Sequence, residues 1–396
     1  MIAREIKPGI KAIISAHWER RLFDSLIPLP DGTSYNAYLV EGESATALID
    51  TTDPDLREDL MSQLVEVKRI DYIVSNHAEQ DHSGLLPELL EKYPEAMLLC
   101  SAKAKDLLMT HLSVDEARVR VVKDGEEVSL GGKTMRFIYT PWVHWPETMC
   151  TYIPESKVLF SCDFFGSHLA TTDLFVVDKG LTYRSAKRYY AEIMMPFRGA
   201  IEGNLKKLAA LDFDMIAPSH GPIYDDPKFI IDAYKDWGSP TVKNEVCLPY
   251  VSMHGSTKLM VHYLVDALVK RGVKVHLFDL LVTDIGELAM SLMDCATLIA
   301  GTPTVHVGAH PAMYYAAHIA NMVRPKTKYA AVIGSYGWAT KAAEAIVGQI
   351  PNLKVEVLGT VMQKGLPTAE TFAQLDALAD AVVKAHTDGG IDMGAQ

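Results

Sequence analysis

The segment His77-Ala78-Glu79-Gln80-Asp81-His82 contains four potential metal ligands within six residues. It follows an apolar run at 72–74 that predicts a buried strand, and it precedes 83–86, which predicts the start of a helix. We therefore expect a loop at the end of a strand, where an irregular backbone can direct all four side chains inward. Imidazoles mixed with carboxylates suit iron, zinc or manganese. The alternative is a polar turn followed by a charged helix start.

The composition is that of a globular protein with a sizeable core. The chain has 396 residues, of which 48% are hydrophobic and 22% charged, and this length suggests two or three domains. Its net charge of −12 argues against nucleic acid and anionic membranes as partners. The N-terminus lacks the apolar core of a signal peptide, and no apolar run is long enough to span a membrane. We expect a cytoplasmic protein.

The cysteines support a reducing compartment. There are five, they are widely spaced, and most lie inside apolar runs, which predicts buried free thiols. No Cys-x-x-Cys pair occurs, so we expect neither a zinc ribbon nor a rubredoxin-type iron site in the chain.

Three further candidate ligands follow predicted strands in the first half of the chain. His144 comes after the strand 134–139, Asp163 after 158–161, and His220 after 214–217. Strands of a common sheet system end at a common rim, so we expect these side chains to converge with the 77–82 segment. A lone histidine in such a place would more often be a polar turn residue. The other elements expected here are a hairpin at 36–50, strands at 96–100, 119–122 and 149–153, and helices at 55–67, 84–92, 103–111, 186–196 and 202–211.

Together these residues resemble a known family. The set is His77, Glu79, Asp81, His82, His144, Asp163 and His220, and it resembles the binuclear site of the metallo-β-lactamase fold, an αββα sandwich, over about residues 30–240. Hydrolases of that fold have the motif HxHxDH, whereas flavodiiron proteins have HxExDH, which matches Glu79 here. The segments 144–148 (His-Trp-Pro-Glu-Thr) and 219–222 (Ser-His-Gly-Pro) also resemble flavodiiron proteins.

The resemblance implies a non-haem diiron site. One iron would be held by His77, Glu79 and His144, the other by Asp81, His82 and His220, and Asp163 would bridge them. Compared with the hydrolase motif, Glu79 adds one negative charge. This disfavours Lewis-acid hydrolysis, which relies on excess positive charge to acidify a bound water, and it suits iron that cycles between oxidation states.

The second half of the chain alternates strands and helices after a linker at 238–240 (Gly-Ser-Pro). This pattern predicts a doubly wound parallel sheet, whose ligands bind at the carboxyl ends of the strands. The expected strands are 245–251, 273–279, 295–300, 328–333 and 353–358. The expected helices are 256–271, 284–293, 312–322, 338–349 and 368–385.

Three loops in this half predict a flavin site. The first, Ser252-Met253-His254-Gly255-Ser256-Thr257, joins a strand to a helix and can wrap a phosphate with its amides and hydroxyls. It resembles the phosphate loop of flavodoxins, although His254 stands where they commonly have Thr; a serine-rich helix cap without a ligand is the alternative. The other two resemble flavodoxin-like isoalloxazine loops and are Gly301-Thr302-Pro303-Thr304 and Gly334-Ser335-Tyr336-Gly337-Trp338.

The aromatic ring of Trp338 can cover a flat isoalloxazine, although an ordinary hydrophobic residue at a helix start is the alternative. No dinucleotide-binding GxGxxG motif follows a strand, so FMN is favoured over FAD or NAD.

The whole pattern resembles flavodiiron proteins of the minimal two-domain class. We expect a metallo-β-lactamase-like diiron domain at 1–242 and a flavodoxin-like FMN domain at 243–396. The resemblance implies reduction of dioxygen to water, nitric oxide to nitrous oxide, or both, with electrons from a separate donor, rubredoxin or reduced coenzyme F420. It also implies a head-to-tail homodimer, alone or paired into a tetramer, in which each FMN abuts the partner's irons. The rival hypotheses are a hydrolase with a regulatory nucleotide- or flavin-binding domain, and a non-catalytic electron carrier.

Overall fold

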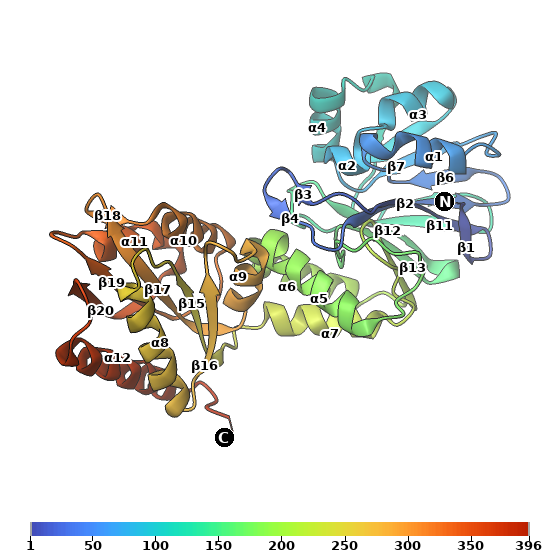
Figure 1. The fold of residues 1–396 in the computed structure, drawn as a ribbon. Coiled ribbons are helices and arrows are strands. Elements are labelled where there is room, and N and C mark those ends of the chain that lie inside the picture. The colour runs from blue at the N-terminus through green and yellow to red at the C-terminus, as the bar shows by residue number, and fades with distance from the viewer. Residues whose placement is uncertain (1, 395–396) are drawn as a thin grey trace. The chain divides into compact units, whose positions relative to one another are not determined.

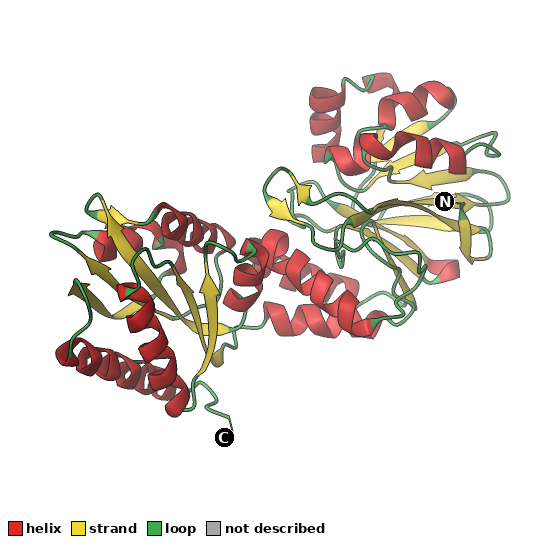
Figure 2. Cartoon of the chain, viewed as in Figure 1, coloured by secondary structure: helices red, strands yellow, loops and turns green. Residues whose placement is uncertain are grey.

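The computed structural model describes residues 2–394, and these divide into two compact units. The first unit comprises 2–189 and 197–238, and the second comprises 239–394 together with the short segment 190–196. Figures 1 and 2 show the elements of both units. None of the helices within 2–394 is long and apolar enough to cross a membrane.

The first unit is built on two sheets. One runs in the order β1-β2-β5-β6-β7-β8-β9 and the other in the order β10-β11-β12-β13-β14. The strands of the first sheet are β1 (Arg4–Lys7), β2 (Ile10–His17), β5 (Thr33–Glu41), β6 (Thr46–Ile49), β7 (Tyr72–Ser75), β8 (Met97–Cys100) and β9 (Val119–Val121). Those of the second are β10 (Glu127–Ser129), β11 (Thr134–Tyr139), β12 (Met149–Ile153), β13 (Val158–Cys162) and β14 (Met215–Pro218). A small hairpin joins β3 (Leu22–Phe23) to β4 (Ile27–Pro28).

The two sheets enclose one core and are covered by helices. Tyr38 and Val74 of the first sheet belong to the same buried cluster as Phe137 and Phe160 of the second. The other face of the first sheet packs against α1, α3 and α4 through residues such as Leu60. The helices are α1 (Arg57–Gln63), α2 (Gln80–Ser83), α3 (Leu86–Lys92), α4 (Ala102–Leu112), α5 (Lys179–Tyr189), α6 (Arg198–Leu208) and α7 (Pro227–Gly238). The expected αββα sandwich is confirmed, since short fully buried strands such as β12 need cover on both faces.

The second unit is a parallel sheet in the order β16-β15-β17-β19-β20, which is the flavodoxin-like order 2-1-3-4-5. Its strands are β15 (Lys243–Tyr250), β16 (Lys274–Asp279), β17 (Cys295–Val305), β19 (Tyr329–Tyr336) and β20 (Glu356–Lys364), with β18 (Gly308–Ala309) antiparallel to the end of β17. Its helices are α8 (Ser256–Lys270), α9 (Ile285–Leu292), α10 (Pro311–Val323), α11 (Ala342–Gln349) and α12 (Ala369–Asp388).

Helices cover both faces of this sheet, as expected. One buried cluster joins the sheet to α9, α10 and α11, and a second joins it to α8 and α12. Because both faces are covered, the central strands β15, β17 and β19 are mostly buried apolar runs, which is typical of a doubly wound sheet, whereas the edge strands β16 and β20 are more exposed.

Several boundaries differ from expectation. The helix expected at 186–196 begins at Lys179 as α5 and continues from Tyr190 as a π-helical turn, η4 (Tyr190–Met194). The helix expected from Trp338 begins at Ala342, and the Thr340 hydroxyl, which accepts a hydrogen bond from the Ala342 amide, holds the residues before the helix in a turn. Strands β1, β2 and β10 and helix α7 were not anticipated.

Candidate metal centre

The 77–82 segment divides into a turn and a helix. His77 and Glu79 follow β7 in an irregular turn, whereas Asp81 and His82 lie in the single-turn helix α2. The expectation that a loop would hold all four ligands is therefore wrong for the second pair. The Ser83 hydroxyl donates to the carbonyls of Ala78 and Glu79 and fixes this change of backbone conformation. As a result the motif presents two separate pairs of ligands.

The first pair meets His144, which comes from the loop after β11. Glu79 Oε2 lies 3.0 Å from His77 Nε2 and 3.1 Å from His144 Nε2. All three side chains are buried or nearly so. Two imidazoles and one carboxylate thus point at a common volume.

The second pair meets His220, which follows β14. Asp81 Oδ2 lies 3.1 Å from His82 Nε2 and 3.5 Å from His220 Nε2. This set has the same composition as the first, two imidazoles and one carboxylate.

Asp163, at the end of β13, lies between the two sets. Its Oδ2 is 3.4 Å from His77 Nε2 and 3.3 Å from His144 Nε2. Its Oδ1 is 3.0 Å from His82 Nε2 and 3.2 Å from His220 Nε2. Each oxygen of one buried carboxylate therefore faces a different pair of imidazoles, which is the geometry that a bridging ligand requires. All seven residues predicted as ligands lie in this cluster.

The cluster fits metal ions on a second observation. Both oxygens of Asp81, both ring nitrogens of His82 and Asp163 Oδ1 are buried without a hydrogen bond of ordinary geometry. Buried polar atoms are nearly always paired, since leaving one unpaired costs about 1–3 kcal/mol. Cations bound between these atoms would satisfy them, and the mixture of imidazole and carboxylate suits iron.

The electrostatics favour cations throughout the site. Burial alone would lower the pKa of His77, but hydrogen bonds to Glu147 and Glu79 outweigh it and raise that pKa to about 10. Burial is likewise outweighed at His144, where hydrogen bonds to Asp163 and Glu79 raise the pKa to about 9. Burial would raise the pKa of Asp163, yet the surrounding imidazoles hold it well below its usual range. The carboxylates of the cluster therefore stay ionised, and their negative charge favours a bound cation.

Partners outside the cluster orient two of the histidines. His77 Nδ1 lies 2.7 Å from Glu147 Oε1, and His220 Nδ1 donates to the Ser34 carbonyl at 2.8 Å. Sequence reasoning did not assign Glu147 a role, although it lies only three residues after His144. The sequence signal that could have indicated a role for Glu147 is a carboxylate directly before Thr148 and the apolar strand β12. In the structure, residues 147–153 are all buried.

The three predicted flavin loops lie at the carboxyl ends of β15, β17 and β19, which are neighbours in the sheet. Gly255 adopts a left-handed conformation (φ +92°) just before α8 and, as a glycine, offers no side chain to cap the helix. The amides of Ser256 and Thr257 are available to an anion such as a phosphate, whereas the amide of Lys258 is already bonded to Ser252. The Ser252 hydroxyl accepts from the amides of Gly255 and Lys258, both at 3.2 Å, and shapes the loop.

The other two loops are tied to the first and to each other. Thr257 Oγ1 lies 2.9 Å from Ser335 Oγ, and the Thr302 carbonyl lies where a Cβ on Gly334 would be, 1.9 Å away. Glycine is therefore required at 334 for this close approach. Thr302, Pro303 and Thr304 form part of β17, which is longer than expected.

The loop side chains differ in exposure. Met253 is 51% exposed and Trp338 is 75% exposed, and His254 and Gly337 are also exposed, whereas Ser256 and Tyr336 are half-buried. Exposed aromatic and thioether side chains around a polar loop are available to cover a planar ring or to meet a partner.

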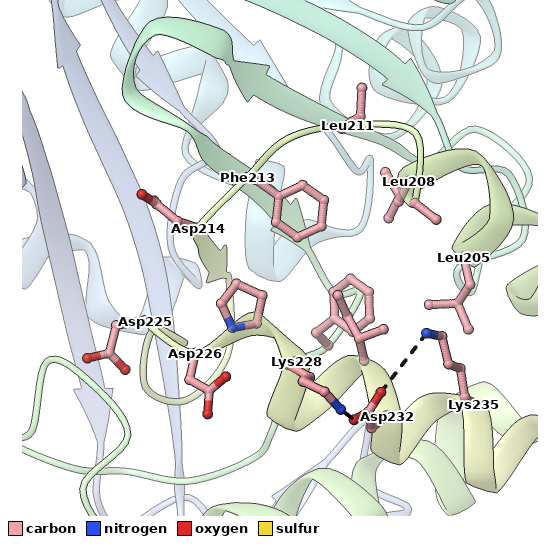
Figure 3. A pocket seen from close by; sticks show the side chains of 14 residues that line it. Leu205, Leu208, Leu211, Phe213, Asp214, Asp225, Asp226, Lys228, Asp232 and Lys235 are labelled. Carbon is pink, nitrogen blue, oxygen red and sulfur yellow. Dashed lines mark hydrogen bonds and ion pairs between the residues drawn. The ribbon is translucent and has the colours of Figure 1, made fainter.

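A separate cavity of about 700 Å³ lies beside α6 and α7 (Figure 3). Its walls combine apolar side chains such as Leu205 and Phe213 with a charged rim on which Lys228 and Lys235 reach Asp232. The described residues that line it include no histidine, cysteine or glutamate. This cavity is therefore distinct from the metal cluster.

Comparisons with known proteins agree on one family. The profile described as "ODP family beta lactamase" matches residues 33–221. The nitric oxide reductase of Moorella thermoacetica is 36% identical over 362 residues, which are 89% of this chain and 90% of that protein. The coenzyme F420H2 oxidase of Methanothermobacter marburgensis is 35% identical over 353 residues, covering 85% and 86% of the two chains.

Solved structures are similar over almost the whole chain. The rubredoxin oxygen:oxidoreductase of Desulfovibrio gigas superposes with a TM-score of 0.94 at 29% identity, covering 98% of this chain and 99% of that one. The flavodiiron protein of Giardia intestinalis superposes with a TM-score of 0.91 at 26% identity and covers 99% of both.

Proposed function

Because the chain belongs to the flavodiiron protein family, we propose that it is an oxidoreductase that reduces dioxygen to water, nitric oxide to nitrous oxide, or both. The observation that supports this best is Asp163, whose two oxygens each face a different histidine pair. The chemistry takes place at two irons, which supply reversible one-electron redox steps when bound.

In this proposal the seven residues of the cluster hold the two irons. His77, Glu79 and His144 bind one, Asp81, His82 and His220 bind the other, and Asp163 bridges. Three buried carboxylates offset the charge of the two ions, so the protein tolerates ferric as well as ferrous iron. Six of the seven ligand side chains are buried and His144 is partly exposed, so little water reaches the cluster and each of these charge interactions is strengthened.

The electrons pass through FMN bound at the three loops of the second unit. The start of α8 and residues 252–257 receive the phosphate, and Thr302, Pro303, Thr304, Ser335, Tyr336, Gly337 and Trp338 line the isoalloxazine. In this proposal the domain at 1–242 binds the two irons, and the domain at 243–396 binds FMN. The electron donor is a separate molecule, rubredoxin or reduced F420, because relatives are named for both.

The working assembly is a head-to-tail homodimer, alone or paired into a tetramer. Electron transfer requires FMN and irons in near contact, and a two-fold axis makes both junctions at once. Exposed apolar residues near each site support this. Trp142 and Leu22 are 46% and 52% exposed beside the metal cluster, and Met253 and Trp338 are exposed at the flavin loops. Five buried cysteines without a disulfide fit a reducing compartment, and we place the protein in the cytoplasm.

A hydrolase of the same fold is the alternative, and Glu79 argues against it. That carboxylate contacts both His77 and His144, so it occupies the place where the hydrolase motif has a third neutral imidazole. A site with more negative charge acidifies a bound water less.

The test is anaerobic purification followed by gas consumption. Protein loaded with iron and FMN is given rubredoxin or reduced F420, and the removal of dioxygen and of nitric oxide is followed with electrodes. We expect consumption of at least one gas with at least one donor. A colourless, zinc-containing protein that consumes neither gas would contradict the proposal.

A further inference from the structure

The imidazoles of the metal cluster have unequal partners on the ring nitrogen that faces away from it. The Nδ1 of His77 meets a carboxylate, Glu147 Oε1, at 2.7 Å. The Nδ1 of His220 meets a neutral carbonyl, that of Ser34, at 2.8 Å. The Nδ1 of His82 is buried and has no hydrogen-bond partner. Of these three histidines, the one with an anionic partner belongs to the set with Glu79 and His144.

The charge of Glu147 is directed at His77. Its side chain is completely buried, and Oε1 accepts from the Ala78 amide at 3.1 Å as well as meeting His77. Its other oxygen, Oε2, has no hydrogen-bond partner. Isolated charges are costly to bury, so this carboxylate needs the positive charge that reaches it through the His77 ring.

We propose that Glu147 makes the two iron positions electronically unequal, and that it stabilises the ferric state of the iron held by His77, Glu79 and His144. This inference rests on the proposed diiron function. A carboxylate that accepts a hydrogen bond from Nδ1–H raises the basicity of the imidazole. A more basic ligand favours the higher charge on the metal. The reaction concerned is the one-electron reduction of ferric to ferrous iron by the flavin, in which no bond breaks.

The functional consequence is an order of reduction. Within residues 2–394, no carboxylate is hydrogen-bonded to the outer ring nitrogen of His82 or His220; the buried Asp50 carboxylate interacts with the charge of His82 without a hydrogen bond to it and is bonded to Asn76 instead. The iron held by Asp81, His82 and His220 therefore accepts the first electron. The iron on the Glu147 side becomes ferrous last. Glu147 is therefore a positioning and tuning residue that acts through His77.

The test is Glu147→Gln, which keeps the size and the acceptor oxygen but removes the charge. Iron potentials are measured by Mössbauer spectroscopy of isotopically enriched protein poised at a series of potentials. Loss of such an outer partner weakens metal binding about 10- to 100-fold. If the loss falls on the ferric state, the potential of one iron rises by about 60–120 mV, at 59 mV for each tenfold change. The other iron should shift far less.

Glu245→Gln is the matched control. Glu245 also contacts an imidazole at 2.7 Å, that of His276, but in the second unit and away from the metal cluster. It should leave both iron potentials unchanged. Glu147→Asp, which restores the charge, should return the potential of the affected iron toward the wild-type value.

The outcomes separate this inference from the proposed function. Two bound irons whose potentials shift equally, or not at all, in Glu147→Gln overturn the role of Glu147 and leave the diiron function standing. A wild-type protein that binds no iron overturns the proposed function itself. If the Gln variant does not fold, the half-reduced wild type decides: Mössbauer signals from one ferrous site alone support unequal irons, and ferrous signals shared between both sites contradict them.

Discussion

Replacing Asp163 by Asn should remove iron from the cluster while leaving the fold intact. Asn has nearly the same shape, but it replaces one carboxylate oxygen by an amide NH₂ group, which cannot bind a cation. Because Oδ1 and Oδ2 face different histidine pairs, one metal position loses this ligand completely. The other keeps a neutral carbonyl in place of a charged oxygen.

The size of the effect follows from burial. Asp163 is 1% exposed, so water cannot take the place of the missing charge. Removing one partner of a buried, charge-compensated pair costs about 3–5 kcal/mol. At 1.4 kcal/mol for each tenfold change, the iron that loses its ligand should bind roughly two to three and a half orders of magnitude more weakly.

The assay is anaerobic reconstitution with ferrous iron, removal of free iron on a desalting column, and measurement of iron per chain. We expect about two irons per chain for the wild type and about one or fewer for Asp163→Asn, as a bridged pair requires. Circular dichroism confirms that the variant is folded. His262→Ala is the control, since His262 lies in α8 of the second unit and its ring contacts Tyr250 rather than a proposed ligand. Full iron with wild-type affinity in Asp163→Asn would refute the bridging assignment.

Three further predictions address the flavin, the dimer and the stability of the second unit. Ser256→Asp places a negative charge at the start of α8 and should abolish FMN binding, which absorbance of the purified protein will show; retained flavin would exclude this phosphate site. Mixing Asp163→Asn with Ser256→Asp should restore gas reduction once subunits exchange, and exchange confirmed by mass spectrometry without activity would exclude the head-to-tail dimer. His386 is buried between Thr297 and Asn244, and burial lowers its pKa to about 4, so its neutral form stabilises the fold. The free energy of unfolding should therefore fall by up to about 3 kcal/mol as the pH drops from 6.5 to 4. Chemical denaturation at a series of pH values measures this fall. The variant His386→Gln should not show it.

The sequence predicted that these seven side chains converge, and the structure places them together; polar residues at strand ends are local features of the sequence. His144, Asp163 and His220 each follow an apolar strand, and strands of a sandwich end at a shared rim. The chain therefore needed no long-range information to indicate convergence. What the pattern could not show is how the 77–82 segment divides, since the single helical turn of α2 depends on the Ser83 hydroxyl reaching back to two carbonyls.

The hydrogen bonds to the outer ring nitrogens of the histidines could not be predicted from the sequence either, because they also depend on how distant segments fold together. Glu147 and His77 are far apart in sequence, and their hydrogen bond arises from the way the loop after β11 folds over the turn after β7. A periodic pattern reports which face of an element is buried, not which side chain it meets there. Helix α7 and strands β1 and β2 were missed although the sequence carries signals for them, Asp226-Pro227 at the start of the helix, Gly238 at its end, and the turn Pro8-Gly9 between the two strands.

Reoxidation of the reduced protein tests the central claim most directly. The wild type, fully reduced without oxygen, would be mixed with limiting dioxygen while flavin absorbance, remaining dioxygen and hydrogen peroxide are measured. Two irons and one FMN store four electrons, so each chain should consume about one dioxygen, with water as the product. Asp163→Asn, with its iron depleted, should reoxidise slowly and release peroxide. If the wild type released peroxide at the rate of the variant, and its reduced irons were also not oxidised by nitric oxide in a parallel experiment, the irons would not be the site of reduction and the account would be contradicted.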